Sequence, residues 1–195
     1  MTAAADTQLD SLRILLADEQ QDRLDRVAEI VRDAGHEVIA RTIHIGVAAE
    51  AAAETDPDVA IVAPGESDEH ALELIARLVE DAACPVVVFL EKDDPALLRD
   101  AARLGVFGHV TDGDADELQA SLEIALRRYA ELRDLAEAFY RRATVERAKG
   151  VLMERHDVGE QEAFDLMRRQ ARSRHERVVD IARAVLGGHA LLPRG

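Results

Sequence analysis

The sequence predicts an α/β fold with a five-stranded, parallel, doubly wound sheet, followed by a long helix and a small helical bundle. Five short apolar runs alternate with segments of helical periodicity over the first part of the chain. These runs are apolar throughout, which is typical of parallel strands that are covered on both faces. A heptad pattern and then further helical segments occupy the remainder of the 195 residues.

Capping and turn residues delimit the predicted strands and helices. Gly35 follows the first helical segment as a C-cap does, and Asp94 with Pro95 is a typical helix start. Asp114, with Glu117 three residues later, is a capping-box-like start for the next helix. The predicted strands are residues 12–17, 36–40, 58–63, 85–90 and 105–111, and the predicted helices between them are residues 24–31, 46–54, 71–78 and 95–104.

A long helix is predicted after the fifth strand, because apolar residues recur at alternating spacings of four and three from Leu118 to Ala143. Its early part is expected to cover the sheet, and the rest to project and pair with a second copy of the chain. The alternative is that the apolar stripe folds back on the C-terminal helices of its own chain. The predicted dimer seam consists of Leu122, Ala125, Tyr129, Leu132, Ala136 and Phe139.

The C-terminal segment is predicted to form three short helices around a small core that includes Phe164. A turn at residues 156–159 and a break at residues 173–175 separate the helices, and Gly187-Gly188 is expected to end the third. The predicted boundaries are residues 10–113 for the α/β domain, 114–142 for a coiled-coil linker helix, 143–187 for the bundle and 188–195 for a flexible tail.

Composition excludes several classes of function. The net charge of −15 argues against a whole-chain nucleic-acid binder and against an anionic membrane surface. The acidity is confined to residues 1–140, whereas residues 141–195 hold 12 basic and 8 acidic side chains. With no membrane span, no signal peptide and the single cysteine Cys84, the sequence predicts a cytoplasmic protein. Because metal-ligand spacings, phosphate loops and nucleophile motifs are missing, we expect no metal, no cofactor and no enzymatic activity.

Several blocks of residues in the C-terminal segment resemble the ANTAR domain, an RNA-binding module of bacterial transcription antitermination regulators. The resemblance covers roughly residues 141–187. It is carried by Glu146-Arg147-Ala148-Lys149-Gly150-Val151-Leu152-Met153 and then, in order, by Glu162-Ala163-Phe164, Arg168-Arg169, Ala171-Arg172-Ser173-Arg174 and Val179-Asp180-Ile181-Ala182.

This resemblance implies binding to a pair of RNA hairpins with short, similar loops, which lets RNA polymerase pass a terminator. Small neighbours on either side of Lys149 would let RNA approach the helix, and the ammonium would pair with a phosphate or a base edge. The alternatives are helix packing for Ala148 and Gly150 and a solvated charge for Lys149. The segment also lacks the aromatic face that is common in single-strand binders. The residues expected to contact RNA are Arg147, Ala148, Lys149, Gly150, Met153, Arg168, Arg169 and Arg172.

Residues 12–140 resemble the receiver domain of response regulators, which has a flavodoxin-like fold, so the layout resembles a two-domain ANTAR response regulator. A working receiver needs an acidic pair for Mg²⁺, an aspartate that takes the phosphoryl group, a hydroxyl residue and a lysine. Asp18 and Glu19 match the acidic pair, but the other three positions hold Ala63, Leu90 and Asp112. We therefore predict a degenerate phosphorylation pocket and a pseudo-receiver that aspartyl phosphorylation does not switch.

Two functional hypotheses follow from the sequence. The first is a dimeric RNA-binding antiterminator whose partners are tandem RNA hairpin loops and a second copy of the chain. The second is a protein-interaction adaptor that does not bind RNA. In either case the receiver-like domain is a candidate site for a regulatory protein or a small-molecule ligand. DNA binding is disfavoured, because no helix carries the dense row of basic residues that a major groove requires.

Overall fold

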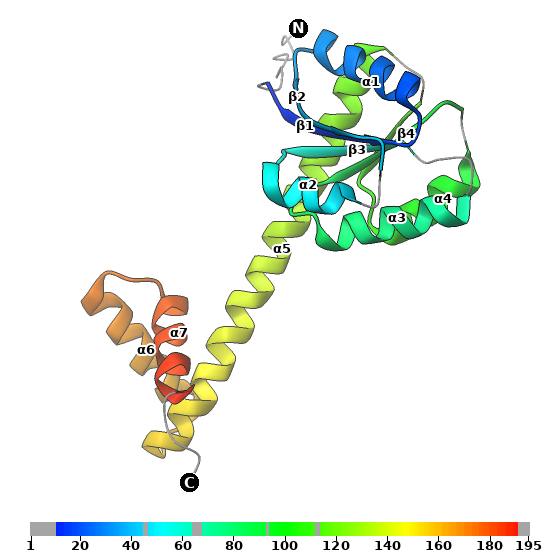
Figure 1. Ribbon diagram of the computed structural model, residues 1–195. Coiled ribbons are helices and arrows are strands. Elements are labelled where there is room, and N and C mark those ends of the chain that lie inside the picture. The colour runs from blue at the N-terminus through cyan, green and yellow to red at the C-terminus, as the bar shows by residue number, and fades with distance from the viewer. Residues whose placement is uncertain (1–10, 45–46, 64–67, 93, 112–113, 191–195) are drawn as a thin grey trace, which may run out of the picture. The chain divides into compact units, whose positions relative to one another are not determined.

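The chain forms two compact units, residues 1–131 and residues 132–195. The first contains a sheet and the helices that cover it, and the second contains a helical bundle (Figure 1). Among the described residues, no helix is both long enough and apolar enough to cross a bilayer. The computed structural model describes residues 11–44, 47–63, 68–92, 94–111 and 114–190.

The first unit is built on a five-stranded parallel sheet, which confirms the predicted fold class. The strand order is β2-β1-β3-β4-β5, the order of the flavodoxin-like doubly wound fold. The register places Asp18 beside Ala63 and Leu90 beside Thr111, so the carboxyl ends of the strands lie along one edge. The strands are β1 (Arg13–Asp18), β2 (Glu37–Thr42), β3 (Val59–Ala63), β4 (Val86–Leu90) and β5 (Gly108–Thr111).

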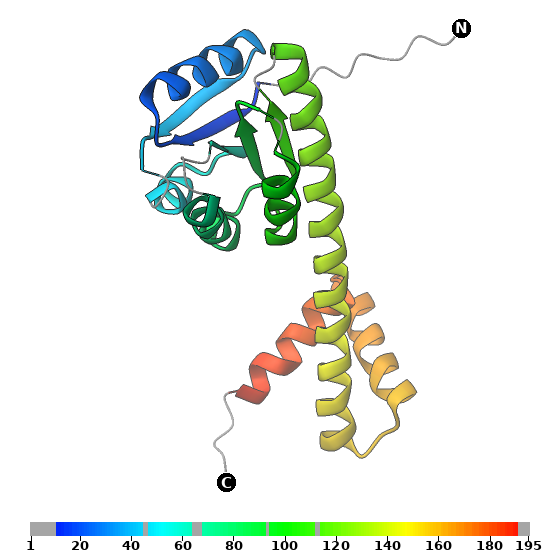
Figure 2. The same ribbon diagram turned by 90° about the vertical axis from the view of Figure 1, so that its right-hand side faces the viewer.

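Helices cover both faces of the sheet, which explains why its central strands are apolar throughout. Helix α1 and the first part of α5 pack on one face, while α2, α3 and α4 pack on the other (Figure 2). Strands β3 and β4 are buried over their whole lengths. The helices are α1 (Gln21–Asp33), α2 (Ala48–Thr55), α3 (Asp68–Asp81), α4 (Pro95–Leu104) and α5 (Ala115–His156).

The capping residues identified in the sequence, Asp94 and Asp114, stand at the starts of α4 and α5. The Asp94 carboxylate accepts hydrogen bonds from the backbone N–H groups of Ala96 and Leu97, both at 3.0 Å. Gly105, which was predicted to begin the fifth strand, instead ends α4 in the left-handed conformation with a φ of 100°, and β5 begins only at Gly108. Asp114 caps α5 by accepting a bond from the Glu117 N–H at 3.1 Å. These local signals place both helix starts at the predicted residues.

Helix α5 is one continuous helix of 42 residues, and its first turns are part of the sheet core. Leu122 and Ala125 are both fully buried among the residues of α1, β3 and β4. The Tyr129 hydroxyl donates to the Ala83 carbonyl at 2.6 Å, and its ring packs edge-to-face on Phe107. The predicted dimer seam is therefore wrong for Leu122, Ala125 and Tyr129, because intramolecular contacts already use these side chains.

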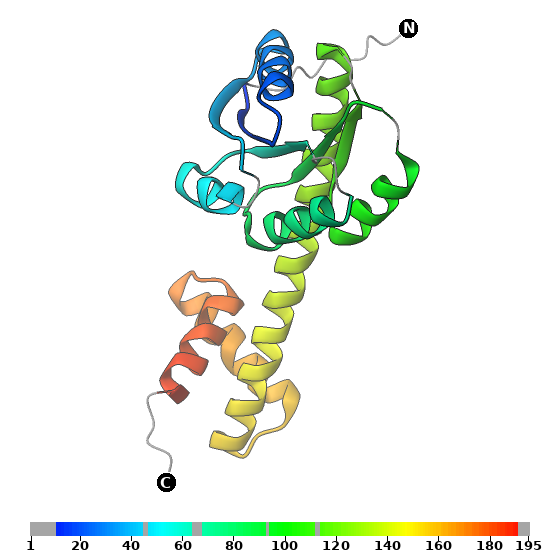
Figure 3. The ribbon, with the colours of Figure 1, turned by 45° about the vertical axis from the view of Figure 1, so that its right-hand side comes forward.

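The second unit packs α6 (Glu160–Arg174) and α7 (Val178–Ala190) against the last turns of α5 (Figure 3). Its core contains Ala148 and Leu152 from α5. Phe164 packs against this core, as the sequence predicted. The other buried members are Ala163, Met167, Ala171, Ile181 and Ala182.

The third helix of the bundle extends beyond its predicted end. Gly187 and Gly188 lie inside α7, which continues to Ala190, so the predicted tail begins too early. Glycine ends a helix when it takes the left-handed conformation, and neither residue does so here. Among the described glycines, only Gly35 and Gly105 have positive φ values. The two glycines in α7 cost stability without stopping the helix.

Substitution of Leu122 tests whether this residue belongs to the core beneath the sheet or to a dimer seam. We expect Leu122→Ala to lower the free energy of unfolding by about 2–5 kcal/mol, because it leaves a cavity beneath the sheet. The matched control is Leu132→Ala, whose side chain is 56% exposed and should cost less than about 1 kcal/mol. Urea unfolding followed by circular dichroism measures both. A small cost for Leu122→Ala, together with a weakened dimer, would restore Leu122 to the seam.

Candidate functional site

The phosphorylation pocket that the receiver resemblance implies is apolar where the chemistry should occur. Ala63 ends β3 and Leu90 ends β4, and their exposed fractions are 2% and 6%. A methyl group cannot take a phosphoryl group, and an aliphatic side chain offers no hydroxyl to one that is bound. The third departure, Asp112, lies outside the described residues. Among those residues, no group of three or more His, Cys, Asp and Glu side chains is placed to hold a metal ion.

The acidic residue Asp18 is already paired within the protein. Both of its carboxylate oxygens accept bonds from the Arg23 guanidinium, at 2.7 and 2.8 Å, and the Gln20 N–H donates a third bond at 2.8 Å. Asp18 is 1% exposed and Arg23 6% exposed. Such a buried bidentate pair neutralises the carboxylate that Mg²⁺ would otherwise require. Arg23 was not predicted as a site residue, although its position beside Leu24 on the apolar face of α1 was a usable signal.

The space beside Ala63 is closed as well as apolar. The described residues around it leave only a small void that does not admit a water-sized molecule. Seven of the eight lining side chains are hydrocarbon, which is the environment of a core and not of an ion site. The void is lined by Leu16, Ala17, Asp18, Leu24, Val27, Ile61, Ala63 and Phe89.

Two of the residues predicted to contact RNA are buried in the bundle. Ala148 is fully buried in the core between α5, α6 and α7, so it is a packing residue and the prediction that it touches RNA is wrong. Lys149 is 8% exposed, and its ammonium lies 2.7 Å from the Glu146 carboxylate and 2.6 Å from that of Glu160. Lys149 is therefore not a solvated charge, because its ion pairs tie α5 to the start of α6.

These ion pairs shift the ionisation of both partners. The hydrogen bonds that the Lys149 ammonium donates to the carboxylates of Glu146 and Glu160 raise the pKa of Lys149 above its ordinary value. The same contact lowers the pKa of Glu160 below its usual value of 4.5, chiefly through the hydrogen bond from Lys149. Across the physiological range Lys149 thus stays protonated and Glu160 stays ionised.

The remaining residues of the predicted RNA face are exposed. On α6, Arg168, Arg169 and Arg172 lie on the side away from the buried Ala163 and Met167. On α5, Arg147, Gly150 and Met153 are exposed. A Cβ added to Gly150 would meet nothing within 4 Å, so the backbone there is open to an approaching molecule.

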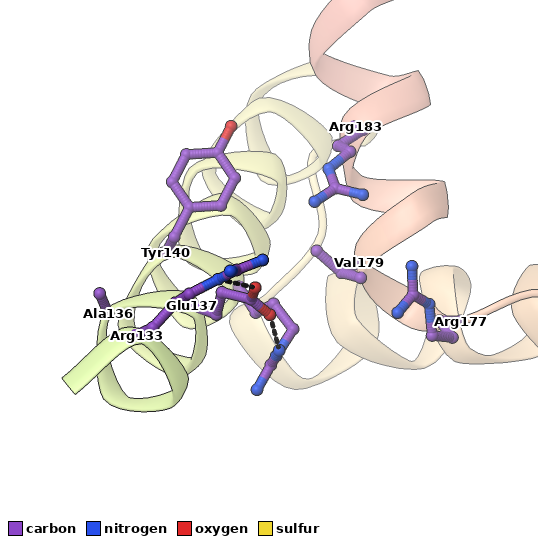
Figure 4. A pocket seen from close by; sticks show the side chains of 8 residues that line it. Arg133, Ala136, Glu137, Tyr140, Arg177, Val179 and Arg183 are labelled. Atoms are coloured by element: carbon purple, nitrogen blue, oxygen red, sulfur yellow. Dashed lines mark hydrogen bonds and ion pairs between the residues drawn. The ribbon is translucent and has the colours of Figure 1, made fainter. Parts of the chain in front are cut away.

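A basic cleft with an aromatic residue lies between α5 and α7, and no sequence pattern predicted it. Its volume is about 510 Å³. Figure 4 shows Val179 and Arg183 of α7, and Arg177 just before that helix, facing α5, which carries Glu137 and Tyr140. Tyr140, which is 54% exposed, thus places an aromatic ring beside arginines in this unit. Tyr140 lies before residues 143–187, the predicted bundle, so the sequence did not associate this aromatic residue with the arginines of the bundle. The other lining residues are Arg133, Ala136 and Arg141.

The fold of the first unit is similar to that of receiver domains of known structure. It resembles the receiver domain of a modulated diguanylate cyclase from Desulfovibrio desulfuricans G20, with a TM-score of 0.53 and 22% identity, over 62% of this chain and 98% of that one. It also resembles a LuxR-family two-component response regulator from Aurantimonas sp. SI85-9A1, with a TM-score of 0.52 and 25% identity, over 60% and 86% of the two chains.

Residues 133–186 match the ANTAR domain. The chain is also 28% identical, over 185 residues, to the transcriptional regulatory protein PdtaR of Mycobacterium tuberculosis strains CDC 1551 / Oshkosh and H37Rv, a match that covers 89% of both chains. The chain thus combines a receiver-like fold in its first unit with a following segment that matches the ANTAR domain. The family match begins upstream of residue 143, so it includes part of the segment that was predicted as a linker.

The link between Lys149 and Glu160 makes the bundle sensitive to pH. Because the pKa of Glu160 is lowered in the folded state, its contribution to stability is present above pH 4.5 and is lost as the pH falls through the lowered pKa. Lys149 has a raised pKa, so its contribution is lost only as the pH rises through that value. We expect Lys149→Gln to return the pKa of Glu160 towards 4.5, as measured by NMR titration of the side-chain carboxyl carbon.

The control for this titration is Lys92→Gln, which removes the other lysine of the chain from the first unit and should leave Glu160 unchanged. A Glu160 pKa that stays low in Lys149→Gln would show that Lys149 does not cause the shift.

Proposed function

We propose that this protein is an RNA-binding transcription antitermination regulator that recognises paired hairpins in nascent mRNA. The observation that carries the proposal is an exposed arginine face on α6, Arg168, Arg169 and Arg172, inside the matched ANTAR domain. In an acidic protein, a local group of guanidinium side chains provides the bidentate donors that fit phosphate.

The architecture of the bundle supports this role. Ala163, Met167 and Ala171 anchor α6 in the core, and the ion pairs of Lys149 hold the start of that helix against α5. The arginines are therefore presented on a supported helix, which lowers the entropic cost of binding. Phosphate contacts of this kind position the protein, while loop bases are read by stacking and hydrogen bonding. Lys149 acts in this proposal as a positioning residue.

A second copy of the chain supplies the second hairpin contact in this proposal. The middle of α5 exposes large apolar side chains, with exposed fractions of 56% for Leu132, 68% for Leu135 and 76% for Phe139. Exposed leucine and phenylalanine at heptad spacing favour pairing with another helix. Ala136 lies between them and completes what remains of the predicted seam. A dimer would present two arginine faces to two adjacent hairpins.

The receiver-like domain acts without aspartyl phosphorylation in this proposal. The supporting observations are the apolar ends of β3 and β4 and the bidentate pair between Asp18 and Arg23. Regulation then comes from a partner protein or a small ligand that binds this acidic domain.

RNA binding is tested by a gel shift with an RNA that carries two adjacent hairpins with six-nucleotide loops, without a phosphodonor. Single-hairpin RNA and duplex DNA are the comparison ligands. We expect Arg168→Ala combined with Arg169→Ala to weaken binding. The dependence of log K on log salt should fall by about 0.7 for each phosphate that the variant no longer neutralises. The matched control is Arg127→Ala, which removes an exposed arginine of α5 in the first unit.

Other outcomes of the gel shift would contradict the proposal. An absence of binding, both by the full chain and by residues 112–195, would favour the protein-interaction adaptor. Equal affinity for duplex DNA would indicate electrostatic binding without RNA recognition.

Phosphorylation is tested separately with acetyl phosphate and Mg²⁺. We expect no stable phosphoryl group on the protein, because the end of β3 offers a methyl group instead of a carboxylate. Intact-protein mass spectrometry measures the mass before and after treatment, and a receiver domain with its aspartate serves as the positive control. Stable incorporation of one phosphate would overturn this part of the proposal.

A further inference from the structure

We propose that the cleft between α5 and α7 binds one nucleotide of single-stranded RNA, with the base stacked on Tyr140 and the phosphate held by arginines. This inference rests on the proposed RNA-binding function and adds a specific subsite to it. The subsite is separate from the arginine face of α6, because its residues come from α5, from α7 and, in Arg177, from the residue just before α7.

Tyr140 provides the stacking surface. Its side chain is 54% exposed, so a planar base can reach the ring. The guanidinium carbon of Arg183 lies 6.0 Å from the ring centroid, at the limit of a cation–π contact. A flat aromatic ring beside a flat guanidinium offers two surfaces on which a base stacks, a combination that recurs in proteins that bind single-stranded nucleic acid.

The charge of the cleft favours an anion. Four arginines, Arg133, Arg141, Arg177 and Arg183, line it. Glu137 pairs with Arg141 at 3.2 Å and with Arg133 at 3.9 Å, and Asp180 pairs with Arg177 and Arg183, both at 3.0 Å. Four guanidiniums against these two carboxylates leave an excess of positive charge. Each guanidinium has five N–H donors, so these pairs leave donors for a phosphate group.

The dimensions and the remaining side chains fit a nucleotide. A volume of about 510 Å³ is within the range of small-molecule sites. Val179, which is 6% exposed, adds an apolar surface from α7. The Glu137 carboxylate among the lining residues can accept a hydrogen bond from the amino group of a base, as acidic residues do with cytosine.

These features favour RNA over an acidic peptide as the occupant. A peptide carboxylate would satisfy the arginines, but it would leave the exposed ring of Tyr140 without a flat partner and the Glu137 carboxylate without the amino donor that a base supplies. A nucleotide uses the aromatic ring, the arginines and the carboxylate together. Arg147 lies seven residues after Tyr140, on the same side of α5, so it can contact the next phosphate of the strand.

The tyrosine content of the chain allows a direct test. There is no tryptophan and there are only two tyrosines, so Tyr129→Phe leaves Tyr140 as the sole tyrosine fluorophore. We expect the double-hairpin RNA to quench this fluorescence at the concentrations at which it shifts the same variant on a gel. Tyr140→Phe, which retains only Tyr129, is the matched control and should show no quenching after correction for absorption by RNA.

Substitutions at the cleft give an independent readout. Tyr140→Ala should weaken RNA binding at least fivefold, whereas Tyr140→Phe keeps the ring and should restore most of the affinity. Arg183→Ala should weaken binding more than Arg183→Lys. Arg103→Ala, an exposed arginine of α4, should leave the affinity unchanged. Melting temperatures of all variants are compared with the parent protein.

The outcomes separate this inference from the proposed function. A gel shift without quenching of Tyr140, or with full affinity in Tyr140→Ala, overturns the nucleotide subsite and leaves RNA binding intact. Quenching by cytidine monophosphate but not by RNA identifies a mononucleotide site and overturns the assignment to RNA. Binding of neither ligand overturns both the subsite and the proposed function.

Discussion

The two hydrophobic cores of this protein both depend on one uninterrupted helix. Near its start, α5 contributes Leu118, Leu122 and Ala125 to the core beneath the sheet. Towards its end it contributes Ala148 and Leu152 to the core of the bundle. Because both sets of residues belong to α5, neither core is complete without this helix. The two ends of the heptad pattern thus correspond to packing against the sheet and packing within the bundle, and the pattern is not one coiled-coil seam along its whole length.

Helix α5 is also one of the elements that the receiver-like fold of the first unit requires. The sheet needs covered strands, correct register and the first turns of α5, and the sequence supplies all three. Catalysis of phosphoryl transfer needs polar groups at the strand ends, and β3 and β4 instead end in buried hydrocarbon. The Asp18–Arg23 pair is the only ion pair buried on both sides among the described residues, and it gives both carboxylate oxygens of Asp18 a partner within the protein.

Features of the fold that depend on residues close together in the sequence were predictable, and features that depend on distant residues were not. The start of α4 was predictable because Asp94 and Pro95 act within a few residues of each other. The strands were predictable because burial on both faces leaves an uninterrupted apolar run. The end of α7 was missed because Gly187 and Gly188 are compatible with both outcomes, and the choice depends on the conformation of the backbone.

The candidate site was harder to predict, because its features are contacts between elements. Lys149 was recognised as unusual, yet its partner Glu160 begins another helix, and only the packing of α6 on α5 brings them together. Arg23 and Tyr140 were missed for the same reason, since each acquires its role from a neighbouring element. Ala148 was predicted as a site residue because it belongs to the recognised motif, but the structure buries it in the core of the bundle.

The middle of α5 differs from both of its ends in what stabilises it. Residues 130–142 are all exposed, and the ion pairs that Glu137 makes with Arg133 and Arg141 are among the few contacts of their side chains. A helical stretch of this length is marginal in water without packing, and exposed ion pairs add little. Backbone amides here should therefore exchange with solvent hydrogen faster than those beneath the sheet or within the bundle. Slower exchange in this stretch would be a direct signature of whatever molecule covers it.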